Sequence, residues 1–111
     1  MTSYTNKTAP SLVKDSVLRL VKVALSCQSG EDLDISKKRI DVILKELSKI
    51  MLPFPPLCTI FWSKVDKELT ALVNKKCDPR YLSVILHARY RVKLYKRYSE
   101  KINTCHLTSD K

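Results

Sequence analysis

Apolar residues recur every three or four positions along most of this chain, which is the period of a helix with one buried face. The pattern predicts four helices, over about residues 9–27, 35–52, 59–75 and 79–103. The last of them is the longest, and we expect it to extend beyond the other three. No repeat or low-complexity tract separates the segments, so they should pack as one unit.

The apolar residues of each predicted helix share one side of a helical wheel. The expected core faces are Val13, Val17, Leu20, Val21 and Ala24; Ile40, Ile43, Leu44, Leu47, Ile50 and Met51; Phe61, Trp62, Val65, Leu69, Leu72 and Val73; and Tyr81, Val84, Ile85, Ala88, Val92, Tyr95 and Ile102. Trp62, the only tryptophan, is expected in this core or at a subunit interface.

Several residues at the predicted helix ends have the chemistry of caps. Asp78 followed by Pro79 is a favourable start for the fourth helix, because the carboxylate accepts from a free N–H and proline lacks one. Thr8 suits the N-cap of the first helix, and Asp34 or Ser36 suits that of the second.

Glycine and proline mark the connections between the helices. Gly30 suits a left-handed C-cap of the first helix. Residues 53–56 (PFPP) are expected to form a stiff extended turn from which Phe54 reaches the core. Since Gly30 is the only glycine in 111 residues, hairpins and glycine-rich phosphate loops are disfavoured.

These features predict an all-α fold, a compact bundle of four helices with a long basic C-terminal helix. At 111 residues the chain is expected to be one domain that needs no disulfide or metal to support its core. Residues 1–7 and 104–111 are expected to be flexible tails.

The positive net charge of the chain favours some classes of partner over others. The net charge is +10 with a pI of about 9.6, which favours nucleic acid, an anionic membrane or acidic proteins. The last predicted helix holds much of that charge, because Glu100 is the only acid among its basic residues Arg80, Arg89, Arg91, Lys93, Lys96, Arg97 and Lys101.

Four of these cations, Arg89, Lys93, Arg97 and Lys101, are spaced four apart and form one ridge, here called the basic ridge. Each step rises about 6 Å along a helix, close to the separation of successive phosphates in a strand. Lys96 lies beside the ridge, and Arg91, Tyr90 and Tyr98 lie on adjoining faces, where they could bond phosphates or stack. The candidate nucleic-acid-binding residues are therefore Arg89, Arg91, Lys93, Lys96, Arg97 and Lys101.

The sequence favours a non-enzymatic protein that binds duplex RNA without reading its sequence, such as a viral RNA-sequestering accessory protein. RNA is favoured over DNA, and a homodimer formed through the strip of Tyr95, Ser99 and Ile102 would place two basic helices across a groove. One alternative is a helical subunit whose basic face docks on an acidic protein. Others are a solvated basic face without a partner and, last, peripheral membrane binding.

Catalytic and metal chemistry is expected to be absent. His87 and His106, the two histidines, have no motif around them that indicates a nucleophile and base. Cys27, Cys58, Cys77 and Cys105 form no close pair of the kind that zinc sites use, so no cofactor or metal is expected. The N-terminal residues lack the apolar segment of a signal peptide, which favours reduced thiols in the cytoplasm or nucleus.

Overall fold

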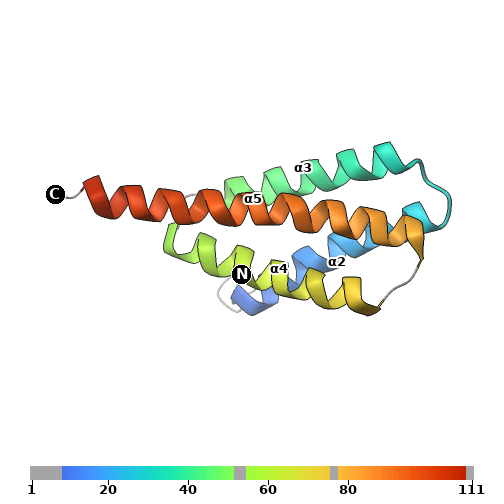
Figure 1. Ribbon diagram of the computed structural model, residues 1–111, viewed down its shortest axis with the longest axis horizontal. Helices are drawn as coiled ribbons and strands as arrows, with labels where there is room; N and C mark the ends of the chain where they lie inside the picture. Colours follow the sequence, from blue (N-terminus) through green and yellow to red (C-terminus); the bar gives the residue numbers. More distant parts are fainter. Residues whose placement is uncertain (1–8, 52–54, 76–77, 110–111) are drawn as a thin grey trace, which may run out of the picture.

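The computed structural model describes residues 9–51, 55–75 and 78–109, with the backbone alone for 9–11, 55–56 and 102–109. All regular structure in these residues is helical (Figure 1). The helices are α2 (Ala9–Gln28), α3 (Leu33–Met51), α4 (Pro55–Lys75) and α5 (Pro79–Ser109). The all-α fold of four helices predicted from the apolar pattern is confirmed.

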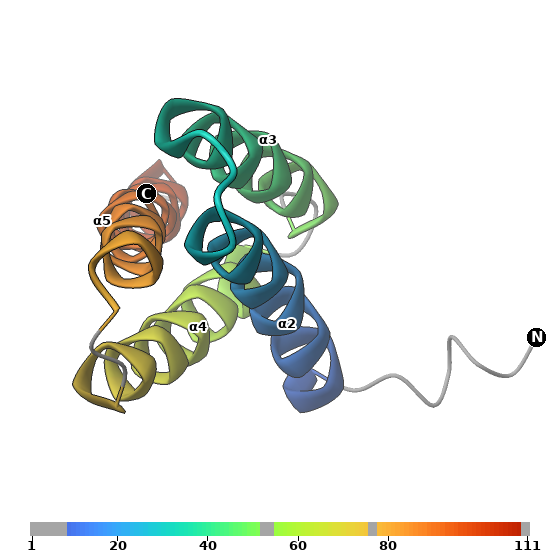
Figure 2. The ribbon, with the colours of Figure 1, turned by 90° about the vertical axis from the view of Figure 1, so that its right-hand side faces the viewer.

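Helix α5 is the element around which the others are arranged. It contacts α2, α3 and α4, most extensively α4. Seen end-on, these three helices lie around one side of α5 and leave its other side uncovered (Figure 2). With 31 residues α5 is about 46 Å long, against a longest molecular dimension of 52 Å, and its C-terminal turns extend past α3 and α4 (Figure 1).

The core lies where the four apolar faces meet. Its largest fully buried side chains include Trp62, Tyr81, Phe61, Leu20, Ile40, Leu44, Leu69 and Ile85. Phe61 meets Trp62 edge to face with ring centroids 4.9 Å apart, and Trp62 stacks on Tyr95 at 5.0 Å. Such pairs add specific geometry to the burial of apolar area. Trp62 is therefore a core residue that joins α4 to α5.

Among the apolar residues and cysteines, four positions depart from the predicted core. One is Val23, which is buried although it was not assigned to the inner face of its helix. Ile50 was expected inside but is 55% exposed, because it lies at the edge of the apolar face of α3, in the last turn. Cys27 and Cys58 were not assigned to the core, yet both are buried free thiols. A free cysteine behaves as a small apolar side chain, so this burial fits its chemistry.

The start of α5 is capped as predicted, and the start of α3 is not. The Asp78 carboxylate accepts from the backbone N–H groups of Arg80 (3.0 Å) and Tyr81 (3.1 Å). For α3 the cap is Asp32, whose Oδ1 accepts from the N–H groups of Asp34 (2.8 Å) and Ile35 (3.2 Å). The prediction of Asp34 or Ser36 was wrong because α3 already begins at Leu33.

Gly30 ends α2 in a Schellman motif. Its N–H donates to the Cys27 carbonyl, the Glu31 N–H donates to the Ser26 carbonyl, and its φ is +126°. Arg80 adds a second cap from α5, because its guanidinium donates to the carbonyls of Cys27 (2.8 Å) and Glu31. The predicted glycine cap is confirmed, and Arg80 has a structural role.

Helices α4 and α5 are both longer than predicted. Helix α4 begins at Pro55 instead of Thr59, since prolines are tolerated in a first turn that has no use for their N–H. Helix α5 continues to Ser109, six residues past the predicted end at Asn103, and the sequence between them holds no glycine or proline to stop it. The predictions for Thr8 and Phe54 lie outside the described residues.

The Cys58 thiol connects α4 to the C-terminal end of α3. It donates to the Met51 carbonyl at 2.8 Å, one of the groups that the end of a helix leaves without an intrahelical partner. Burial raises the pKa of this thiol, and a side-chain interaction with Ser99 on α5 opposes the increase. Burial likewise raises the pKa of the Tyr81 phenol.

We expect the free energy of unfolding to fall as the pH rises above about 8.5, where the thiol of an unfolded chain ionises. The raised pKa of Cys58 keeps more protons on the folded than on the unfolded state, so stability is lost as the pH rises toward the folded pKa. Urea unfolding at pH values between about 7 and 9.5 measures the decline. Cys58→Ala should flatten it; a profile parallel to that of the wild type would contradict the assignment.

Candidate nucleic-acid interface

The six candidate residues do not share one side of α5. Lys93, Arg97 and Lys101 are exposed, whereas Arg89, Arg91 and Lys96 are half-buried. The difference follows from the helical period, since α5 is enclosed by three helices over one side only.

Arg91 lies toward α3. Its Nε is 3.3 Å from Asp41 Oδ1, and His87 Nε2 lies 2.9 Å from the same oxygen. Asp41 therefore joins two residues of α5 to α3. His87 was expected on a polar face, and the structure shows that its ring is occupied by this contact.

Arg89 lies toward α4. Its Nε is 3.6 Å from Asp66 Oδ1, and the side chains are only 31% and 17% exposed. Charges that are partly removed from water in this way are screened less by salt than exposed ones. The basic ridge is thus divided: Arg89 contributes to the contact between α4 and α5, and the three cations that follow it face outward.

Lys93, Arg97 and Lys101 form the exposed part of the ridge, here called the exposed cations. Within the described part of the chain, none of them takes part in an ion pair. They are spaced four apart, so each lies about 6 Å along the axis from the next. They therefore offer a ligand three positive charges on long side chains that start from regularly spaced positions along α5.

A second row of four residues lies beside the exposed cations, and we call it the apolar row. Its exposed fractions are 42% for Leu86, 61% for Tyr90, 40% for Leu94 and 59% for Tyr98. The sequence indicated the two tyrosines as neighbours of the ridge but missed that both leucines align with them. Their spacing of four residues was the available signal.

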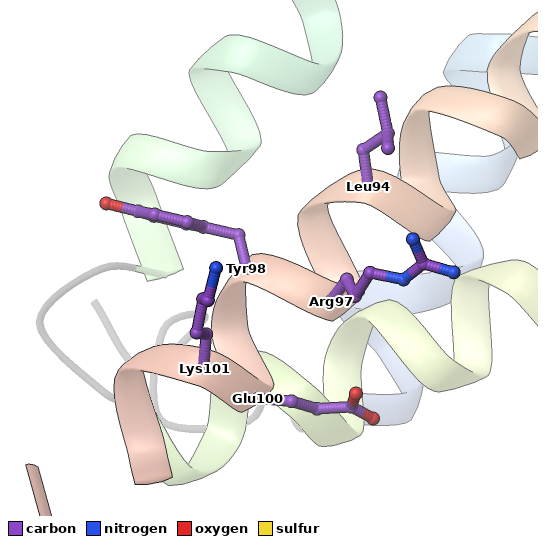
Figure 3. Close-up of a pocket in the computed structure, with 5 residues that line it drawn as sticks. All are labelled: Leu94, Arg97, Tyr98, Glu100 and Lys101. Atoms are coloured by element: carbon purple, nitrogen blue, oxygen red, sulfur yellow. The ribbon is translucent and has the colours of Figure 1, made fainter. Parts of the chain in front are cut away.

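The two rows meet near the end of the described part of α5. A shallow, open depression of about 500 Å³ is lined there by Leu94, Arg97, Tyr98, Glu100 and Lys101 (Figure 3). Figure 3 shows Tyr98 and Lys101 directed to one side of α5, with Arg97 and Glu100 directed to the other. An aromatic ring and a cation are thus presented together on the outer surface.

Two of the three residues proposed for a dimer strip are used within the chain. Tyr95 stacks on Trp62, and Ser99 is buried and donates to the Tyr95 carbonyl at 2.9 Å. The side chain of Ile102 lies outside the described part. The strip fails as a dimer contact because its first two residues face α4, and the homodimer itself stays a prediction.

Metal sites, membrane-spanning helices and known relatives give no further indication of function. Among the described side chains, no group of histidine, cysteine, aspartate and glutamate could hold a metal ion. No helix in the described residues is long and apolar enough to cross a membrane. Comparison with models of known protein families, with curated proteins and with solved structures gives no significant match.

Proposed function

We propose that this protein is a non-enzymatic nucleic-acid-binding protein that contacts the phosphate backbone through the outer face of α5. The observation that carries the proposal is the row of Lys93, Arg97 and Lys101, which are exposed and evenly spaced. Their spacing of about 6 Å matches that of successive phosphates in one strand. Arg89 and Arg91 support this face through Asp66 and Asp41 instead of binding the ligand directly.

Binding of this kind has defined physical properties. Phosphate contacts fix position but carry no base information, so affinity should depend little on sequence. Each neutralised phosphate releases counterions, so affinity should fall steeply with salt. The net charge of +10 would speed encounter with any polyanion before the specific contacts form.

Fluorescence anisotropy at several salt concentrations tests the proposal. With three phosphate contacts, the slope of log Kobs against log salt is expected to be about −2 for a single strand or steeper for a duplex. Two ligands of equal length and unrelated sequence should bind within a factor of about three of each other, because base contacts are absent. No binding at about 50 mM salt would contradict the proposal.

A helical protein-interaction subunit is the second candidate, and one feature favours it. Between α2 and α3 lies an open groove with Ile35 (51% exposed) and Val42 (57% exposed) on its surface. Arg19 and Lys38 also line it. An apolar groove with a basic rim suits an amphipathic helix that carries acidic residues. This candidate becomes the better one if the chain binds no nucleic acid.

A further inference from the structure

We infer that the ligand of α5 is single-stranded, with unpaired bases on Tyr90 and Tyr98 and phosphates on the exposed cations. The inference rests on the proposed function and specifies the substrate class of the same face. It differs from the duplex predicted from the sequence. The reason is the placement of the apolar row next to the exposed cations.

The residues of this face repeat every four positions. Residues 90–93 (YRVK), 94–97 (LYKR) and 98–101 (YSEK) each begin with a member of the apolar row and end with an exposed cation. Residues three apart are neighbours on a helix surface, so each ring or leucine adjoins the cation of its own tetrad. The face therefore presents an exposed apolar side chain beside a cation three times along the axis, with an aromatic ring in the first and third tetrads.

One tetrad corresponds to one nucleotide. It advances about 6 Å, which is close to the separation of successive phosphates. Aromatic rings bind single strands by stacking on bases of any identity, while cations follow the backbone. Tyr90 and Tyr98 are two tetrads apart, so the two rings would take bases that flank one nucleotide resting against Leu94.

A duplex would leave the tyrosine rings without a role, because only their hydroxyls could bond its phosphates. Its bases are already stacked and paired, and proteins recognise duplex RNA by phosphates and 2′-hydroxyls across the minor groove. Tyr90 and Tyr98 are 61% and 59% exposed, so packing within the chain does not explain their rings. Arg89, the cation that would extend the ridge along a duplex, is engaged with Asp66.

A second copy of the chain is a poorer occupant for the same face. Pairing two α5 helices through the apolar row would bring Lys93, Arg97 and Lys101 of one copy close to the same residues of the other. Like charges at such distances repel, and only Glu100 lies among them in the sequence. A single-stranded nucleic acid offers bases to the apolar row and phosphates to the exposed cations.

The test compares a labelled, unstructured RNA of about 12 nucleotides with a duplex of equal length at about 100 mM salt. Wild type is expected to bind the single strand at least about tenfold more tightly than the duplex. Tyr90→Leu/Tyr98→Leu keeps an apolar surface but removes both rings, so single-strand affinity should fall about 30-fold or more while duplex binding changes little. Leu18→Ala/Leu25→Ala, on the exposed surface of α2, is the matched control and should bind as wild type.

The outcomes separate the inference from the function on which it rests. Tighter duplex binding, or a double tyrosine variant that binds the single strand as wild type does, would overturn the inference and leave nucleic-acid binding standing. If the protein bound neither the single strand nor the duplex, the proposed function would be contradicted as well. Sedimentation of the free protein provides a third check. A stable dimer that Tyr98→Asp dissociates would show that a second copy covers this face, and it would overturn the inference.

Discussion

Replacing Lys93, Arg97 and Lys101 together by glutamine is expected to abolish nucleic-acid binding at physiological salt. The three side chains are exposed and outside any ion pair in the described residues, so their charges are available to phosphates. Removing three contacts should flatten the slope of log Kobs against log salt by about 2. Anisotropy titration between about 50 and 200 mM salt measures both effects.

Folding should be nearly unaffected by this triple substitution, because exposed positions outside a packed contact usually change stability by less than about 0.5 kcal/mol. Arg89 is unchanged in this variant because it pairs with Asp66. Its removal would leave Asp66, 17% exposed, without its cation and would confuse a loss of binding with a loss of stability.

The matched control replaces three exposed lysines of other helices, Lys14, Lys22 and Lys45, by glutamine. It therefore lowers the net charge by the same amount as the first triple variant. It should keep most of the affinity, with a modest decrease from weaker long-range attraction. An equal loss in both triple variants would show that binding is spread over the whole +10 surface and is not located on α5.

Ile85→Ala is expected to have the largest effect on stability. Ile85 is fully buried where α5 packs against the other helices, and truncating such a side chain removes burial and leaves a cavity. The free energy of unfolding should fall by about 2–5 kcal/mol, a large part of the stability of a domain of this size. Urea unfolding followed by circular dichroism measures the change through the shift in midpoint at constant m-value.

Leu86→Ala supplies the control, because the neighbouring side chain has the same number of carbon atoms and is 42% exposed. Its substitution should lower the free energy of unfolding by less than about 1 kcal/mol. Similar losses for the two variants would contradict the burial of Ile85 and the exposure of Leu86.

The candidate site could be predicted from the sequence only in part. The spacing of four residues identified the basic ridge, and it brings Lys93, Arg97 and Lys101 together on the surface of α5. It could not indicate which cations meet acids from other helices, because Asp41 and Asp66 are distant in sequence from Arg91 and Arg89. A helical wheel describes the arrangement of side chains on one helix, whereas an ion pair between helices depends on how the two helices pack.

The sequence by itself determined the four helices, the Asp78 and Gly30 caps and most of the core. These depend on local physics: the helical period, the hydrogen bonds of a helix end and the conformational freedom of glycine. The tertiary structure alone decided that Tyr95 and Ser99 are covered by α4, that Arg80 caps α2, and that Arg89 and Arg91 meet acids of α4 and α3. The orientation of neighbouring helices sets these outcomes, and it depends on contacts between residues far apart in the chain.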